Sequence, residues 1–544
     1  MNKNQTEKMV QDRWLQGRGP VGDYLRDQFN RIKMPFLGLY AFAFFLYLPM
    51  IVLRLTNDMD GLWDQDDHVA GEAELRIGRW FWMHVARARF FVSMDPIPLV
   101  IALAVFVAGI LLILSVLRLR FTFVSAVSCL LFLSSISLTA QMAYSYMAIE
   151  FSLSFLLAVL AVLVVERGKK AYLCIPLAGL CLSLSMGLYQ ASLGVCTLLI
   201  LFVLLFRLLR GEESAQTRLF LARAMGAVLT GGILYFLLLK LHLFFFHTTL
   251  SDYGGAAEVS PWSILRSFPS SLKHTYTAVW FYFFNGLFQQ NRFPDIVAHA
   301  AYLVPLLSLF LAILLIGRHS IRRALLFAFL ALGIPVFANS FFFLATNATT
   351  QPQMTIPMAL ILPLCLLFPG ERKPLSFPVR GLIRRLVCGA YLLGAFILLY
   401  GSTWMVETDF YAMNAGRRAT MTLTESILNA LDAREIDYIH TGILIIGGPG
   451  QSETFERDPL YAEANDFAQY GNWDGVYQEE SRICWRKVFE KLYRLNIQYV
   501  TPEVMERFYQ LPEVKAMPVY PAPGGIAQIY GVTVIKLTNE VFAE

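Results

Sequence analysis

Long apolar stretches decide the fold class, and the clearest of them is residues 96–117, PIPLVIALAVFVAGILLILSVL. A helix needs about 20 apolar residues to cross the hydrocarbon core of a bilayer, and this stretch is long enough. Hydrophobic residues make up 56% of the 544-residue chain and charged residues only 16%, whereas a soluble domain carries about 25% charged residues. The composition excludes a disordered chain and a single soluble domain, and it predicts an all-α membrane protein.

Outward from this stretch, the apolar pattern predicts eleven transmembrane helices. The loops on the N-terminal side of the membrane hold roughly three times as many lysine and arginine residues as those on the other side. This bias predicts a cytoplasmic N-terminus and, because the number of spans is odd, an extracytoplasmic C-terminus. The expected spans are 35–54, 96–117, 121–140, 148–165, 171–187, 190–207, 224–246, 300–316, 324–345, 354–369 and 387–404.

The pattern divides the chain into three parts. Residues 1–33 mix charged and apolar side chains and are expected to lie along the cytoplasmic surface as an interfacial segment. Residues 34–404 form the multispanning domain, with long outer loops at 55–95 and 247–299. Residues 405–544 form a polar tail, expected to be a small extracytoplasmic α/β domain. Its expected elements are helices at 417–433 and 483–495, strands at 438–446 and 497–500, and a hairpin at 526–537.

Two partner classes have no support in the sequence. The formal net charge of +5 is small for this length, so a nucleic-acid partner is not expected. The short basic inner loops contain no glycine-rich phosphate-binding motif, so a soluble nucleotide is not expected on that side.

The first outer loop carries an adjacent acidic pair, Asp66 and Asp67, followed by His68. A carboxylate at a membrane face is able to act as a general base on a sugar hydroxyl, and a neighbouring carboxylate is able to raise its pKa or hold a metal. The alternative is a solvated acidic loop. The nearest further histidine is His84, so no histidine-based metal site is predicted. Binding of a divalent cation by aspartates alone stays an open alternative.

Basic residues on the same side are candidates for binding a phosphate. Arg76 and Arg79 share the first outer loop, and Arg292 lies in the second; the planar guanidinium group matches phosphate oxygens well. Lys240 lies inside an apolar span near its outer end, where an ionisable group commonly faces a polar cavity. The alternatives are an arginine that anchors to lipid headgroups, a surface-loop arginine, and a lysine that extends to the interface.

Tyr189 and Gln190 join two spans at the outer face. A polar pair at such a turn either lines a cavity or ends two helices. Together with His68, this pair is the candidate lining of such a cavity.

The order of several short motifs resembles that of the Gtr-type bacterial membrane glucosyltransferases, which modify O-antigen and belong to the GT-C class of glycosyltransferases. The resemblance covers most of residues 35–435. Its motifs are Asp66-Asp67, Gly78-Arg79, Asp95-Pro96-Ile97-Pro98, the segment from Leu182 to Ser192, the segment from Tyr235 to Lys240, and the segment from Asp409 to Ala433.

The resemblance implies an enzyme of the cell envelope in the bacterial cytoplasmic (inner) membrane. It implies a polyprenyl-phosphate-linked sugar as donor, with glucose as the sugar, and a glycan or glycolipid acceptor on the outer face. Asp66 or Asp67 would be catalytic, Arg79 and Lys240 would bind the donor phosphate, and Tyr189 and Gln190 would line the sugar pocket. Two other classes stay open: a transporter or flippase of a lipid-linked glycan, and a non-catalytic membrane scaffold.

Overall fold

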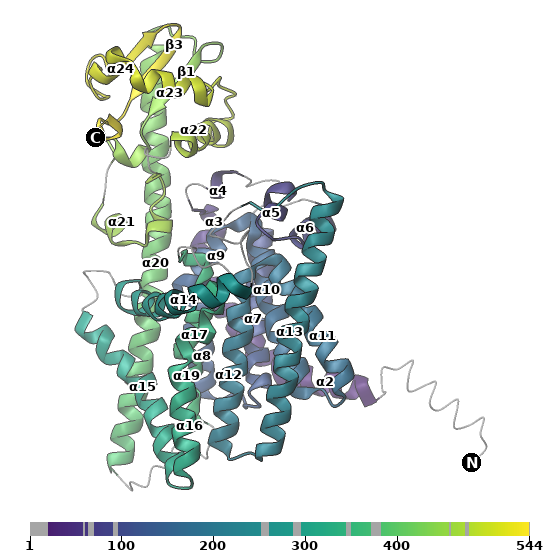
Figure 1. The fold of residues 1–544 in the computed structure, drawn as a ribbon. Helices are drawn as coiled ribbons and strands as arrows, with labels where there is room; N and C mark the ends of the chain where they lie inside the picture. Colours follow the sequence, from purple (N-terminus) through teal and green to yellow (C-terminus); the bar gives the residue numbers. More distant parts are fainter. Residues whose placement is uncertain are drawn as a thin grey trace, which may run out of the picture.

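The protein folds into a helical bundle from which one long helix extends to a small lobe, as the computed structural model shows (Figure 1). The structure describes residues 20–57, 60–63, 70–90, 96–251, 261–286, 295–343, 350–370, 382–455, 458–473 and 478–542.

Seven helices in the described part of the chain are long and apolar enough to cross a membrane. Large hydrophobic side chains stay exposed on several of them, as on a surface that faces lipid. The described part of the chain is mostly helical, and its long apolar helices are compatible with a membrane protein. The seven helices are α7 (Ile97–Val116), α10 (Ala148–Arg167), α11 (Ala171–Leu188), α12 (Leu193–Arg210), α13 (Ser214–Phe245), α15 (Asp295–Gly317) and α20 (Leu382–Asp432).

The span predicted at 121–140 is broken. It consists of α8 (Phe123–Leu133) and α9 (Ile136–Ala143), which meet at 43°. The Ser135 side chain accepts a hydrogen bond from the Leu138 N–H and so begins a new helix there. Counted as one span, this pair raises the total among the described residues to eight.

Three further spans of the predicted eleven correspond to helices in two pieces, and the total of eleven stays a prediction. In each case a proline stands at the start of a new helical segment, which interrupts the hydrogen-bond ladder. The shortest of them, Ile356–Leu366, has about 11 residues and extends about 16 Å, roughly half of the thickness of the hydrocarbon core. The pieces are α2 (Pro20–Leu46) with α3 (Leu48–Leu53), α16 (Ile321–Leu332) with α17 (Ile334–Ala338), and α18 (Ile356–Ala359) with α19 (Ile361–Leu366).

Small residues let α11 and α13 approach closely. A Cβ atom added at Gly179 would lie 2.9 Å from the Thr230 Cβ and 3.1 Å from the Gly231 N. Glycine at such a contact lets two backbones pack directly in a membrane. This contact fixes α13 against α11, the helix that ends just before Tyr189.

Helix α14 (Pro261–Phe281) lies across the bundle rather than along it (Figure 1). It continues as a π-helical turn, Tyr282–Gly286. In this aromatic segment Trp280 is exposed, whereas Tyr282 is buried and its hydroxyl lies 3.0 Å from the Ser137 Oγ. One side of the segment therefore packs on the bundle while the other faces outward, as expected of aromatic residues at an interface.

The C-terminal lobe contains a three-stranded sheet in the order β1-β3-β2. Strands β2 (Ile526–Ile529) and β3 (Val532–Lys536) form the predicted hairpin, and β1 (Gly442–Ile446) pairs parallel to β3. Alternate residues of β1 enter separate apolar clusters on the two faces of the sheet, which explains its uninterrupted apolar run. The helices of the lobe are α22 (Gln478–Lys487), α23 (Pro502–Gln510) and α24 (Pro512–Ala516).

Four predicted elements of the lobe differ in extent. The helix predicted at 417–433 is the end of α20, and the helix predicted at 483–495 consists of part of α22 and the π-helical turn Val488–Leu492. The strand predicted at 438–446 begins only at Gly442, because the Asp437 carboxylate accepts hydrogen bonds from the backbone N–H groups of Ile439 and His440 and holds a turn there. The strand predicted at 497–500 is reduced to one bridge between Ile443 and Tyr499.

Candidate functional site

The first outer loop folds back onto the end of the bundle through a tight turn at Gly78. This turn joins α5 (Glu72–Arg76) to α6 (Trp82–Ala88). Gly78 has φ +86°, and a Cβ atom there would lie 2.6 Å from the Tyr235 hydroxyl and 2.7 Å from the Gln190 Nε2. Only glycine satisfies both this conformation and this close approach.

Two polar side chains, the half-buried Gln190 and the buried Tyr235, hold the turn. The Gln190 Nε2 donates a hydrogen bond to the Ile77 carbonyl at 2.6 Å, and the Tyr235 hydroxyl donates one to the Gly78 carbonyl at 3.1 Å. The same Gln190 nitrogen lies 3.3 Å from the Tyr235 hydroxyl. Residues from the junction of α11 and α12 and from α13 thereby fix the loop backbone just before Arg79.

Arg79 projects from this turn between two aromatic rings. Its guanidinium carbon lies 5.1 Å from the centre of the Trp82 ring and 5.2 Å from the centre of the Tyr189 ring. Cation–π contacts of this kind stabilise a desolvated arginine without a carboxylate. The Arg79 Nε is buried, and no hydrogen-bond partner for it lies within the described residues. The arrangement presents a positioned cation with donor capacity to an anionic group.

A histidine pair joins α6 to the end of α13. The Nε2 atoms of His84 and His242 lie 2.8 Å apart, and the His242 Nδ1 lies 2.7 Å from the Leu238 carbonyl oxygen. When His242 is neutral, its Nδ1–H donates to that carbonyl, so its Nε2 accepts from His84. Burial, together with the nearby His242 and Arg87, lowers the pKa of His84 below its usual value of 6.5.

The histidine pair leads us to expect that the protein is less stable at acidic pH. Because the pKa of His84 is lower in the folded state, its contribution to stability is present above about pH 6.5 and is lost as the pH falls through the folded value. We expect the melting temperature of the purified protein to fall between pH 7.5 and 5.5, and to fall less in His84→Gln. An equal pH dependence in both proteins would contradict this assignment.

A buried ion pair lies further along the same loop. Arg89 pairs with Glu150 at 3.2 Å, and its Nη2 donates a hydrogen bond to the Tyr146 carbonyl at 2.7 Å. The Glu150 side chain is only 1% exposed. Since a buried carboxylate requires a paired charge, this contact ties the end of the first outer loop to the start of α10.

A loop that holds an arginine between two aromatic rings therefore lies on the ends of α10, α11 and α13. A family model described as glucosyl transferase GtrII matches residues 64–368. This match covers more than half of the chain and includes the Gly78 turn. The chain belongs to the glucosyl transferase GtrII family. Neither the curated proteins nor the solved structures contain a match to the chain.

Membership of the GtrII family makes the protein a glycosyltransferase, with a sugar donor and an acceptor as its substrates. The matched region begins two residues before the acidic pair and ends after α19. It therefore includes the first outer loop from residue 64 onward and α13 but excludes α20 and the lobe.

The structure brings some of the predicted site residues of this GtrII-family protein together and separates others. Arg79, Tyr189 and Gln190 meet at the Gly78 turn, as described above. Arg76 is exposed, and its carbonyl accepts a hydrogen bond from the Ser251 N–H at 2.9 Å, so it joins the two outer loops. Four predicted residues lie outside the described residues: Asp66, Asp67, His68 and Arg292.

Lys240 lies on a different side of α13 from the histidine pair. Its side chain is exposed beside the exposed Leu237 and Leu241, whereas Tyr235 and Leu239 on the same helix are buried. Within the part of the chain that the structure describes, no contact joins Lys240 to Arg79. The alternative of a lysine that extends to the interface fits this position, and its role in donor binding stays a prediction.

Several residues of this region had no predicted role. Tyr235 was named only as part of a motif. No role was predicted for Glu150, Arg89 or His242. Glu150 had a usable signal, because a carboxylate at the start of an apolar span requires a partner. Among the described residues, no group of three histidine, cysteine, aspartate or glutamate side chains is arranged to hold a metal ion.

Proposed function

We propose that this GtrII-family enzyme transfers a sugar, with glucose the first candidate, from a polyprenyl-phosphate donor to a glycan or glycolipid acceptor on the outer face of the membrane. The reaction would be of the GT-C type. The observation that carries the proposal is Arg79, held between Trp82 and Tyr189 at the end of the bundle. A cation placed there suits the phosphate of a lipid whose tail lies in the bilayer.

The proposed chemistry divides between the acidic and basic residues. The carboxylate of Asp66 or Asp67 would accept the proton of the acceptor hydroxyl as its oxygen attacks C1 of the sugar. The bond from C1 to the phosphate oxygen would break, and polyprenyl phosphate would leave with the negative charge. Arg79, with Arg76, Arg292 and Lys240 as further candidates, would stabilise that charge.

The sugar pocket would lie beside Tyr189 and Gln190, with His68 as a further candidate. Since the Gln190 amide nitrogen already bonds to the first outer loop, its proposed part is to position Arg79 and the loop. A divalent cation at the aspartates stays an alternative to direct base catalysis.

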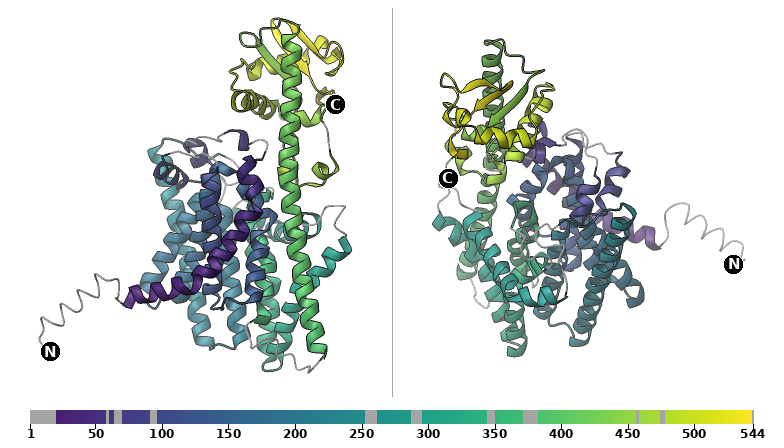
Figure 2. Two further views of the ribbon diagram at one scale, coloured as in Figure 1. Left: turned by 180° about the vertical axis from the view of Figure 1, so that it is seen from behind. Right: turned by 45° about the horizontal axis from the view of Figure 1, so that its top comes forward.

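We propose the bacterial inner membrane as the location, with a cytoplasmic N-terminus and an extracytoplasmic lobe. Two features support this orientation. The loop that contains α5 and α6 and the C-terminal lobe lie toward the same end of the molecule (Figure 2). The basic connections after α7 and α10 lie at the opposite end, as the positive-inside rule requires of cytoplasmic loops.

The test of this function is an assay of purified enzyme in lipid vesicles with a panel of polyprenyl-phosphate sugars, followed by mass analysis of the acceptor. We expect one donor to give a mass increase of one sugar and release of polyprenyl phosphate. Movement of an intact lipid-linked glycan without a mass change would instead indicate a flippase. Neither transfer nor movement, with partner binding through the lobe, would indicate a scaffold.

Lys240→Ala tests whether a second cation binds the donor. If Lys240 reaches the phosphate, we expect donor affinity in detergent to fall about tenfold, the effect of one lost charge-assisted hydrogen bond. Arg218→Gln, at an exposed cation near the other end of the same helix, is the matched control. Unchanged donor affinity in Lys240→Ala would assign this lysine to the interface alone.

A further inference from the structure

A large cavity opens at the end of the bundle opposite the first outer loop. Its volume is about 1310 Å³, larger than the usual 300–1,000 Å³ of a small-molecule pocket. It lies where α7 and α10 end and α11 begins, with Ile32 and Pro35 of α2 at one side. The space is therefore bounded by four helices that pack at one surface of the proposed membrane.

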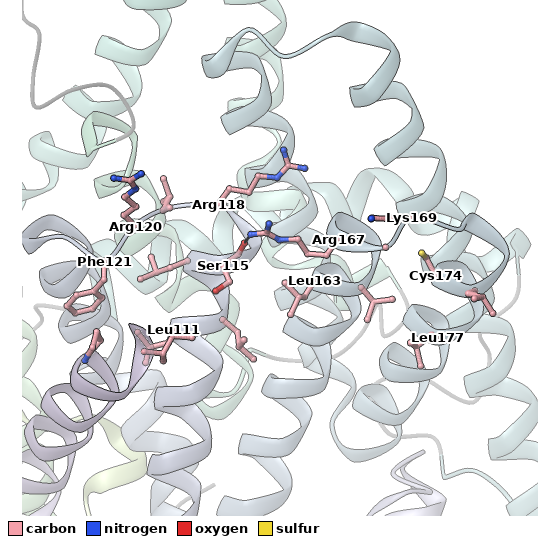
Figure 3. Close-up of a pocket in the computed structure, with 18 of the residues that line it drawn as sticks. Leu111, Ser115, Arg118, Arg120, Phe121, Leu163, Arg167, Lys169, Cys174 and Leu177 are labelled. Carbon is pink, nitrogen blue, oxygen red and sulfur yellow. Dashed lines mark hydrogen bonds between the residues drawn. The ribbon is translucent and has the colours of Figure 1, made fainter. Parts of the chain in front are cut away.

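The rim of the cavity is basic. Five cationic side chains line it, and its lining residues include no aspartate or glutamate. Figure 3 shows four of the five along the same rim. The five are Arg118, Arg120, Arg167, Lys169 and Lys170.

The floor of the cavity is apolar. Leu111, Leu163 and Leu177 come from three different helices and lie on the side away from the basic rim (Figure 3). Apolar side chains at this depth suit hydrocarbon rather than a hydrated solute. The cavity thus has cationic side chains at its rim and apolar side chains in its interior.

Among the described residues, acidic side chains pair with only one of the five rim cations, Arg118. Glu166 binds Arg118 at 2.6 Å and Arg207 at 2.7 Å, and Glu212 binds Arg207 at 2.8 Å. The Arg167 Nη2 donates a hydrogen bond to the Ser115 carbonyl at 2.8 Å. Within the described residues no acidic side chain pairs with the other three cations of the rim, Arg120, Lys169 and Lys170.

We propose that this cavity binds one anionic phospholipid of the membrane leaflet at that end, with the phosphate at Arg120, Lys169 and Lys170 and the acyl chains against the leucine floor. Basic pockets between transmembrane helices on the cytoplasmic side are suited to such headgroups. Five of the cations at this end of the bundle line one cavity that also has apolar walls, which is the combination a phospholipid requires. The inference is independent of the sugar-transfer reaction, since it uses none of the residues of that site.

The test measures lipid binding by the purified full chain in neutral detergent, with native mass spectrometry to count bound lipids. The probes are dioleoyl phosphatidylglycerol and dioleoyl phosphatidylcholine, with free glycerol phosphate as the competitor. We expect phosphatidylglycerol to bind more tightly than phosphatidylcholine and free glycerol phosphate to displace it poorly. Displacement by glycerol phosphate at the affinity of the lipid itself would overturn the proposal, because a headgroup site alone would explain it.

The variants separate the rim from general surface charge. Each basic residue at an anionic surface contributes about fivefold in affinity, so Arg120→Gln, Lys169→Gln and Lys170→Gln together are expected to weaken phosphatidylglycerol binding roughly 100-fold. The matched control removes three exposed cations that lie outside the lining: Arg218, Arg318 and Arg322, each replaced by glutamine. An equal loss in the control, or no loss in the rim variant, would overturn the proposal.

Two single changes keep the test decisive if the triple variant does not fold. Arg120→Gln alone is expected to cost about fivefold. Leu177→Trp fills the floor from a half-exposed position and is expected to weaken lipid binding while leaving the thermal stability unchanged. Full phosphatidylglycerol binding by both variants would overturn the assignment of the lipid to this cavity.

Discussion

Asparagine in place of Asp66 or Asp67 is expected to lower the rate of sugar transfer by about 100- to 10,000-fold. General base catalysis by a positioned carboxylate contributes a factor of this size, and asparagine keeps the shape of aspartate while removing its basicity. The pair lies at the start of the region that matches the GtrII family. The measurement is kcat with the donor identified by the panel assay.

Asp64→Asn is the matched control, because it removes the same charge from the same loop. We expect this variant to keep its activity within about threefold and all three proteins to enter the membrane in equal amounts. Full transfer by Asp66→Asn, by Asp67→Asn and by the double variant would remove both carboxylates from the mechanism. An equal loss in all three single variants would indicate an effect of loop charge instead.

Arg79→Gln is expected to lower kcat/KM for the donor about 100-fold. Loss of one donor that stabilises developing charge in a buried site costs 100- to 1,000-fold, and Arg79 is the arginine that the aromatic rings of Trp82 and Tyr189 position. Arg79→Lys keeps the charge but loses the planar fork, so we expect it to recover only part of the activity.

Arg87→Gln removes an exposed arginine from the neighbouring helix α6 and serves as the control. Its kcat/KM is expected to stay within about threefold of that of the unchanged protein. The melting temperature of each variant must also be compared, because Arg79 contributes packing as well as charge. A stable Arg79→Gln variant with undiminished kcat/KM would exclude Arg79 from donor binding.

The sequence predicted the long spans well because burial in lipid leaves a simple signal. Helices α7, α10, α11 and α12 lie within a few residues of their predicted limits, since an uninterrupted apolar run admits only a spanning helix. The broken segments were harder, because composition alone does not show where a helix restarts. Ser135 and Pro363 lie in runs that are as apolar as an intact span.

Part of the site was also predictable. Tyr189 and Gln190 stood out as polar residues at a turn between two apolar spans, and Arg79 as an arginine of the first outer loop that was a candidate for binding a phosphate. The contacts that organise them were not predictable, because they join distant parts of the chain: His84 to His242, and Gly78 to Tyr235. Contacts between residues so far apart in the sequence depend on how the helices pack against one another, and apolar periodicity does not specify that packing.

Helix α20 has a mechanical consequence for the lobe. It runs without a break over 51 residues, about 77 Å, from within the bundle into the lobe (Figure 2). The buried Asp409 carboxylate of this helix accepts hydrogen bonds from the Asn465 backbone N–H and side-chain amide, so the segment that follows β1 is fastened back onto it. Because the helix is continuous, an insertion between the bundle and the lobe would rotate the lobe about the helix axis. One inserted residue would rotate it by about 100°, whereas seven inserted residues would restore nearly the original orientation and move the lobe some 10 Å further from the bundle.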